Sequence, residues 1–233
     1  ISCVSLFWTR LVIVIGSHPT PLCKVSSYLT LSRTPPIDMY IVRHPQSLSS
    51  IDISEKSSVA EIMKLLLPHI GRWRKLRIVV DRAVSLPCPG LDLCGNAATL
   101  TRLQPESKLD QPTRRNTIDP LAENFQTPAL NELITSGHIF RDAYLLSPKS
   151  LASITTLTIS HYMVDSKPFF IHHLMHCLYR LQNLTNLELM YLDLDCSSEG
   201  RGLDDDQQLD IERMHFQGMH VSSLSSFYRA ANY

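Results

Sequence analysis

Apolar residues recur along the chain at the first, fourth and often the sixth position of short segments whose other positions are mostly polar. These apolar residues are Trp73, Leu76 and Ile78; Leu100 and Leu103; Leu130 and Leu133; Ile154, Leu157 and Ile159; and Leu184, Leu187 and Leu189. Side chains two residues apart lie on one face of a strand, because successive residues point to opposite faces. We therefore expect five strands whose fourth and sixth positions point into the core, while the first position anchors the turn before each strand.

The first residues of these segments are 27, 30, 24 and 30 residues apart. Leucine-rich repeats place an L-x-x-L-x-L segment on one strand per unit, at intervals of about 20–29 residues. Because no such unit buries its apolar face alone, neighbouring units stack. The predicted fold class is therefore α/β: an irregular leucine-rich-repeat-like solenoid, with a curved parallel sheet and with helices and loops on the convex side. The alternative is another kind of α/β protein in which leucine-rich strands recur by chance.

Residues 57–70 (SSVAEIMKLLLPHI) have their apolar side chains at helical spacing. Ser57 or Ser58 can serve as the N-cap, and Glu61 completes a capping box with Ser58. Pro68 is expected to end or kink this helix, because proline lacks the backbone N–H that the helix interior requires.

Other stretches complete the expected organisation of the chain. We expect a strand at 10–15, a short helix at 21–32, a strand at 37–42, and a helix at 167–181 with Pro168 near its first position. Residues 107–128 and 196–208 are rich in proline or polar residues and predict loops. Residues 209–227 fit either a last helix or a frayed repeat.

The charge balance bears on the choice of partner. The chain has 22 Lys and Arg residues and 22 Asp and Glu residues, so its formal net charge is zero. Nucleic acids and anionic membranes attract proteins through a basic field, so we expect neither as a partner. The basic stretch 72–77 (RWRKLR) would be split between two faces if it enters a strand. The apolar run 6–16, interrupted by Arg10, is shorter than the about 20 residues of a membrane span and predicts a buried strand.

Candidate catalytic and metal-binding patterns are weak. The six cysteines have irregular spacing and form no CxxC pair: Cys3, Cys23, Cys88, Cys94, Cys177 and Cys196. This usage predicts reduced thiols in a cytoplasmic or nuclear protein. His172 with His176, and His173 with Cys177, could each place two ligands on one helix face, but no third ligand is evident nearby. We expect no metal or other cofactor. GxGxxG, P-loop and GxSxG motifs are all lacking, so we also expect no enzyme activity.

The strand positions between the inward leucines form the candidate binding surface. They would line the concave face of the sheet, which solenoid proteins commonly use for binding. The candidate partner-binding residues are Lys75, Arg77, Arg102, Gln104, Glu132, Thr156, Thr158, Asn186 and Glu188. The row runs from basic to acidic, which would steer a target protein of complementary charge order. The alternative is that these are ordinary solvated strand residues.

Several segments, in order, resemble fungal F-box-like proteins of the basidiomycete type, in the leucine-rich-repeat-like region downstream of the F-box. SLFWTRLVIVI (5–15) is similar to the segment of these proteins in which the F-box ends with a P-S-L-W element and an apolar strand follows. Trp8 keeps the aromatic residue of the P-S-L-W element, whereas Phe7 departs from it. PIDMYIVRH (36–44), LLLPHIGRWRKLRIVV (65–80), TPALNELITSGHIFRDAYL (127–145) and LTISHY (157–162) continue the resemblance. It covers most of residues 5–195.

The resemblance implies the target-recognition part of an SCF-type ubiquitin ligase subunit. Residues 1–20 would be the tail of an F-box-like region plus the first strand, 21–195 the repeat domain, and 196–233 an acidic loop with a degenerate C-terminal segment. The helices of the F-box would precede Ser5, so a Skp-type adaptor is expected as a partner only if an F-box lies upstream; residue 1 is Ile rather than Met. The alternative is a stand-alone or decayed repeat scaffold with no ligase role.

Overall fold

The computed structural model describes residues 8–44, 54–109, 124–144, 151–162, 168–197 and 209–230. Within these ranges, eight strands form one sheet in which every neighbouring pair is parallel and the strands follow one another in chain order. They are β1 (Arg10–Ile15), β2 (Ile37–Arg43), β3 (Trp73–Arg82), β5 (Arg102–Leu109), β7 (Glu132–Ser136), β8 (Thr156–Tyr162), β9 (Asn186–Leu192) and β10 (Arg213–Gln217). The short strands β4 (Gly95–Asn96) and β6 (Phe125–Gln126) pair with each other.

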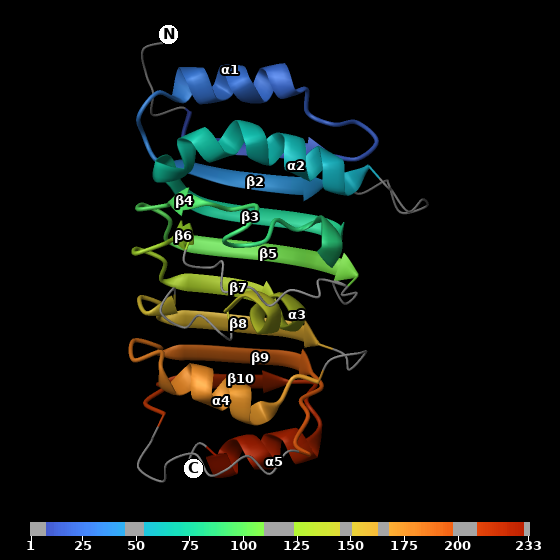
Figure 1. Ribbon diagram of the computed structural model, residues 1–233, viewed down its shortest axis with the longest axis vertical. Helices are drawn as coiled ribbons and strands as arrows, with labels where there is room; N and C mark the ends of the chain where they lie inside the picture. The colour runs from blue at the N-terminus through green and yellow to red at the C-terminus, as the bar shows by residue number, and fades with distance from the viewer. Residues whose placement is uncertain are drawn as a thin grey trace.

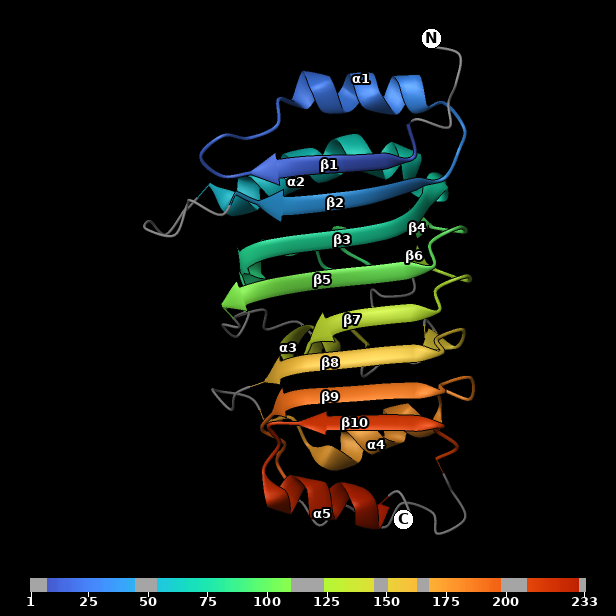
Figure 2. The ribbon, with the colours of Figure 1, turned by 180° about the vertical axis from the view of Figure 1, so that it is seen from behind.

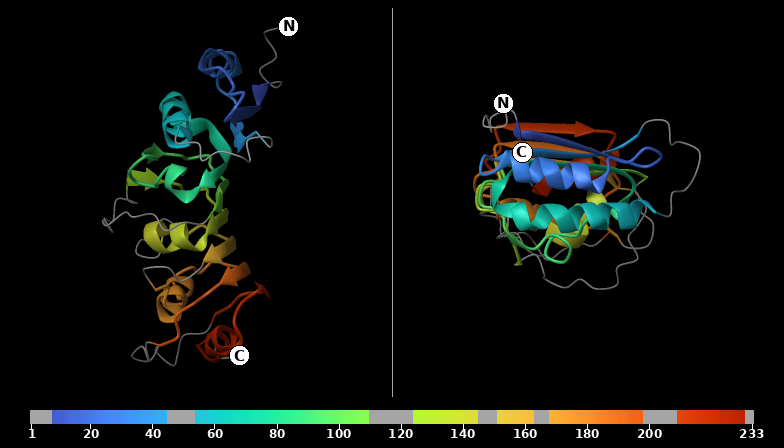
Figure 3. Two further views of the ribbon diagram at one scale, coloured as in Figure 1. Left: turned by 90° about the vertical axis from the view of Figure 1, so that its right-hand side faces the viewer. Right: turned by 90° about the horizontal axis from the view of Figure 1, so that it is seen from above.

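The helices lie on one side of the sheet and at its two ends (Figure 1). They are α1 (Leu22–Ser32), α2 (Glu55–Leu66), α3 (Gly137–Ile139), α4 (Ile171–Tyr179) and α5 (Val221–Ala230), with 3-10 turns at Leu67–Arg72 and Ala83–Ser85 and a π-helical turn at Phe140–Tyr144. Seen from behind, the strands have no described helix in front of them (Figure 2). The side view shows the strands along the inner side of a shallow arc and α2, α3 and α4 along its outer side (Figure 3). The predicted α/β class with a parallel sheet is confirmed.

The inward positions of the five segments form the core, as predicted. Every one of the thirteen residues at these positions is buried, with at most 3% of its surface exposed. The strand register places the fourth-position leucines side by side: Leu76, Leu103, Leu133, Leu157 and Leu187. Burying such a side chain contributes about 1.5–3 kcal/mol relative to leaving it exposed, so this leucine ladder is a principal source of stability.

The first position of each segment anchors a repeated turn, which also confirms the prediction. The backbone N–H of Leu100, Leu130, Ile154 and Leu184 each donates to the carbonyl three residues earlier, at 3.0–3.1 Å. The next residues then bond to the preceding unit: Thr156 N–H donates to Asn131 O, and Asn186 N–H to Thr155 O, both at 2.9 Å. The turn therefore sets each new strand in register with the one before it.

The start of α2 differs from the prediction. The strand at 10–15 is as predicted, but α2 starts at Glu55 with Ser54 at the N-cap position, so the capping box of Ser58 and Glu61 is wrong. The cause is tertiary: the Glu55 carboxylate is buried against Arg43 at the end of β2, 3.0 Å away, and this contact draws the start of the helix toward β2. Pro68 lies in the 3-10 turn that follows α2, where the helix ends as expected.

The helix α4 begins three residues after Pro168, not at it. Phe170 forms a parallel bridge with Asp195, in which Ile171 N–H donates to Asp195 O and Asp195 N–H donates to Phe169 O. This pairing keeps the chain extended up to Phe170. The prediction that placed Pro168 in the first turn is therefore wrong.

The predicted loops and the C-terminal segment contain more structure than expected. Residues 107–109 belong to β5 and Phe125–Gln126 form β6, while 110–123 and 198–208 lie outside the described residues. Residues 209–227, which fitted either a helix or a frayed repeat, contain parts of both: β10 pairs with β9, and α5 follows. Among the described residues, no helix combines the length and apolarity needed to cross a membrane.

Candidate partner-binding surface

The strand register brings the predicted binding residues onto the face of the sheet that the described helices leave uncovered. We call this the open face and define it by the nine predicted residues and their neighbours in register. Lys75, Arg102, Glu132, Thr156 and Asn186 form one unbroken row across β3, β5, β7, β8 and β9. In the second row Arg77 lies beside Gln104, and Thr158 beside Glu188. Stacking in register thus converts positions about 30 residues apart into neighbours.

Both rows continue beyond the predicted residues. Asp38 and Tyr40 of β2 lie beside Lys75 and Arg77, and Arg10 lies beside Asp38. Ile134 pairs with Thr158, and Arg213 and His215 of β10 lie beside Asn186 and Glu188. Sequence reasoning missed the positions in β1, β2 and β10 because these strands lack the leucine pattern, whereas Ile134 lies in a strand that carries it. The alternation in IDMYIV and RMHFQ is the signal that could have located them.

The N-terminal half of the open face contains a hollow of about 220 Å³. Its walls are Tyr40, Lys75, Leu76, Arg77, Arg102 and Gln104. Four of the nine predicted residues therefore meet at one place, which we call the basic hollow. Its volume is below the about 300–1,000 Å³ of ordinary small-molecule pockets. A hollow of this size can receive a single side chain.

Carboxylates hold both arginines of the basic hollow in place. Arg77 contacts Glu106 at 3.2 Å and Arg102 contacts Glu132 at 3.3 Å. Arg102 also donates to the side-chain oxygen of Gln104 at 3.0 Å, and the Gln104 amide in turn donates to Glu106. The network joins the two guanidinium groups to carboxylates on the neighbouring strands.

Lys75 differs from both arginines because it has no ion pair within the part of the chain that the structure describes. The nearest carboxylate in its row, Asp38, is instead bound by Arg74 through two hydrogen bonds of 2.7 and 2.8 Å. The hydrogen bond and charge of Asp38 raise the pKa of Arg74. Asp38 is therefore committed to Arg74, and the hollow retains the positive charge of Lys75.

The central part of the open face is less accessible than predicted. Gln104 and Thr158 are only 8% and 7% exposed, so the expectation that they are exposed is wrong. Their own hydrogen bonds explain this: Gln104 lies between Arg102 and Glu106, and Thr158 donates to Glu188 at 3.2 Å. Longer neighbouring side chains cover these two residues, which position the charged groups above them.

A second ordered feature lies at the carboxyl ends of β8, β9 and β10. His161 and Tyr191 have left-handed backbones, with φ of 56° and 53°, and their rings stack with centroids 5.3 Å apart. Gly218 follows β10 with φ of 62°, and a Cβ there would lie 2.3 Å from the Tyr191 ring. Gln217 donates to the Tyr191 hydroxyl at 2.8 Å. Sequence reasoning missed this aromatic stack, although His161 and Tyr191 occupy the same position in successive segments.

The basic stretch 72–77 runs from the 3-10 turn after α2 into β3. Trp73 is buried, Lys75 and Arg77 face the basic hollow, and Arg72 donates to Pro35 O and to the Ser32 hydroxyl. Arg74 binds Asp38, the residue paired in register with Lys75, and it is the fourth basic side chain of this stretch. A separate hollow of about 170 Å³ lies on the helix side between α2 and residues 84–92, and none of the nine predicted residues lines it.

The histidine-rich helix α4 brings side chains close without forming a metal centre in the described residues. The rings of His172 and His173 are 4.2 Å apart, and burial and the neighbouring histidines lower the pKa of His173. Cys177 is 1% exposed, and burial raises the pKa of its thiol to about 12, which disfavours the thiolate that binds metals. Across the described ranges, no three or more His, Cys, Asp or Glu side chains are grouped to hold a metal ion.

The fold and this surface describe a mixed α/β protein built on a parallel sheet with one open, polar face. Comparisons with protein-family models, with curated proteins and with solved structures give no significant match to this chain. The function proposed below therefore rests on the sequence and on the geometry of the open face.

Proposed function

We propose that the chain is a non-enzymatic protein–protein interaction domain whose open face binds a target protein. The observation that carries the proposal is the open face itself: eight parallel strands in chain order with an unbroken row of polar side chains on the side free of described helices. A broad, ordered and charged surface of this kind suits a protein partner.

The architecture that best accounts for this surface is an irregular leucine-rich-repeat-like solenoid. Three features support it: one sheet strand per unit, the leucine ladder, and the same turn before four successive strands. Each unit would bury its apolar side against its neighbours, and the concave face would remain available for binding.

We propose further that this domain recruits the target of an SCF-type ubiquitin ligase. The support is the ordered resemblance of residues 5–195 to fungal F-box-like proteins. The Skp-type adaptor would bind helices that precede Ser5, so the described residues would supply only the target-binding part. The alternative is a stand-alone or decayed repeat scaffold, which would have no ligase partner.

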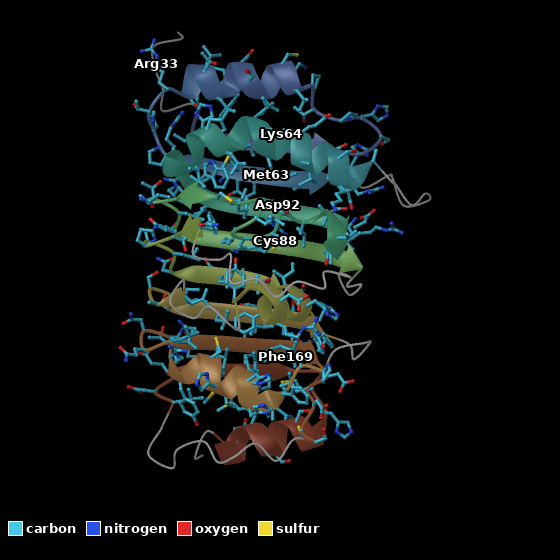
Figure 4. All side chains as sticks on the ribbon, viewed as in Figure 1. Arg33, Met63, Lys64, Cys88, Asp92 and Phe169 are labelled. Atoms are coloured by element: carbon cyan, nitrogen blue, oxygen red, sulfur yellow. The ribbon has the colours of Figure 1, made fainter. Side chains whose placement is uncertain are left out.

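Site-specific photo-crosslinking tests the binding proposal. A photoreactive amino acid replaces Asn186 on the open face or, as the control, the exposed Lys64 on α2, labelled in Figure 4 on the helix side. We expect Asn186 to crosslink one saturable protein partner and Lys64 to give none. The combined reversal of Arg102→Glu and Glu132→Arg should abolish the crosslink. Crosslinks from Lys64 but not from Asn186 would refute the open face as the binding surface.

The ligase proposal needs a separate experiment. The gene's upstream reading frame is joined to this chain, and co-purification with a Skp-type adaptor is measured. We expect binding with the upstream segment and none without it. If the upstream frame encodes no F-box-like helices, or if the adaptor does not bind, the ligase role fails and the scaffold alternative is favoured.

A further inference from the structure

We infer that the basic hollow recognises a carboxylate side chain from an acidic segment of the target, with Lys75 as the cation that binds it. The inference rests on the proposed function, because it names the chemistry of the partner for the same open face. It also says which part of the open face the acidic segment of the target covers, namely β2, β3 and β5.

The charge distribution around the hollow supports an acidic occupant. Arg10, Lys75, Arg77 and Arg102 all lie on the open face of β1, β3 and β5. Glu106 and Glu132 each neutralise one arginine, and the Arg10 guanidinium lies over the Tyr40 ring, 5.6 Å from its centroid. Among the described residues, Arg10 and Lys75 have no carboxylate within ion-pair distance, and of these two only Lys75 lines the hollow. One negative group at Lys75 would therefore balance the charge of the hollow.

The walls of the hollow supply hydrogen-bond donors that suit a carboxylate. The Lys75 ammonium has three donors and each guanidinium five, of which the ion pairs with Glu106 and Glu132 use only part. Tyr40 also lines the hollow, and its side chain carries a hydroxyl donor. A carboxylate accepts at two oxygens and can contact Lys75 and one neighbour at once.

The size of the hollow and its near-neutral balance argue against a nucleic acid in the same place. A phosphodiester backbone is bound through several uncompensated cations, one for each neutralised phosphate. The basic hollow offers one uncompensated cation, Lys75, because its two arginines are paired with Glu106 and Glu132. Its volume of about 220 Å³ fits one acidic side chain, and the paired glutamates would repel a continuous run of phosphates.

Fluorescence anisotropy with a defined probe tests this inference. The probe is a fluorescein-labelled 12-residue peptide with Glu at every third position and Gly and Ser elsewhere, and the reference is the same peptide with Gln for Glu. We expect the Glu peptide to bind at least tenfold more tightly than the Gln peptide. Lys75→Glu should weaken the Glu peptide at least tenfold, and Lys75→Gln by less.

Lys64→Glu is the matched control, because it makes the same charge change on an exposed α2 residue on the opposite side of the sheet. It should leave the affinity within twofold, and circular dichroism should show both variants folded. Equal binding of the Glu and Gln peptides, or loss of binding in both lysine variants alike, overturns the inference. A labelled oligothymidine of equal charge that binds more tightly than the peptide, dependent on Lys75, would overturn it in favour of nucleic acid.

The outcome for the proposed function is read separately from the Asn186 crosslink. If that crosslink forms and is unchanged by Lys75→Glu, the open face binds its target and the carboxylate assignment alone fails. If no crosslink forms while the Glu peptide binds through Lys75, the basic hollow binds carboxylates and the proposed target function fails.

Discussion

Arg43 at the end of β2 and Glu55 at the start of α2 form an ion pair of 3.0 Å in which both side chains are almost fully buried, at 3% and 2% exposure. Glu55 also accepts the backbone N–H groups of Asp81 and Arg82, at 2.8 and 3.3 Å. Arg43 in turn contacts Asp81 at 2.8 Å, and Lys108 reaches Asp81 at 3.2 Å. One carboxylate thus joins α2 to the ends of β2 and β3, and the network extends to β5.

Removing this carboxylate should destabilise the fold strongly. In Glu55→Ala, the buried Arg43 loses one carboxylate partner and keeps Asp81. The backbone N–H groups of Asp81 and Arg82 lose their acceptor. Breaking a buried pair from one side costs about 3–5 kcal/mol. We expect about 3 kcal/mol, because Asp81 still accepts from Arg43. Urea unfolding measures the difference in free energy of unfolding. Glu61→Ala, on an exposed position of the same helix, should cost less than about 0.5 kcal/mol; equal costs for the two variants would contradict the role of Glu55.

The same pair explains why the start of α2 could not be predicted from local sequence. Ser58 and Glu61 match the capping-box pattern in sequence, but a cap contributes only about 1 kcal/mol. The contact of Glu55 with Arg43, twelve residues earlier, outweighs it. Such a contact depends on strand stacking, which local pattern does not specify. In α4, likewise, the bridge between Phe170 and Asp195 overrides the preference of Pro168 for a first helical turn.

Features that depend on strand periodicity were predictable. The residues of β1 and all thirteen inward positions follow from alternation and from the recurring spacing, because burial of a leucine depends on its own strand. The two rows of the open face also follow, once strands are placed next to one another. The low exposure of Gln104 and the stack of His161 on Tyr191 did not, since each depends on which side chain lies on the adjacent strand.

The leucine ladder should be most sensitive at its centre. Leu157 is fully buried between Leu133 and Leu187. Leu157→Ala removes apolar area and leaves a cavity that rigid strands on both sides cannot fill, so we expect a loss of about 2–5 kcal/mol in the free energy of unfolding. Thr156→Ala, one residue earlier on the open face, should cost less than about 1 kcal/mol. Chemical denaturation of both variants checks this, and similar losses would show that position 157 is not at the core.

Gly218 should tolerate no side chain while Tyr191 is present. Its φ of 62° alone makes alanine unfavourable by about 1–2 kcal/mol, and the added Cβ would also lie 2.3 Å from the Tyr191 ring. We expect Gly218→Ala to lower stability by about 2–4 kcal/mol and to displace the ring from His161. In a Tyr191→Ala background the same change should cost only the backbone contribution of about 1–2 kcal/mol. A double-mutant cycle measures this difference, and simple additivity would show that the ring and Gly218 are not in contact.

Burial of Cys177 should make the stability of the protein depend on pH in the alkaline range. Burial raises the pKa of this thiol to about 12, against about 8.5 in an unfolded chain. Above pH 9 the unfolded chain therefore loses the thiol proton while the folded chain keeps it. The thiol therefore leaves the free energy of unfolding at its full value below pH 8.5 and lowers it by up to about 1.4 kcal/mol per pH unit as the pH rises toward 12.

Cys177→Ala lowers the free energy of unfolding by a constant amount through the cavity it leaves, but it removes this titration. We expect the gap in free energy of unfolding between the native chain and Cys177→Ala to shrink by about 2 kcal/mol from pH 8.5 to pH 10.5. Comparing the two chains at each pH cancels the contributions of other titrating groups, and a gap that stays constant would show that the thiol ionises equally in both states.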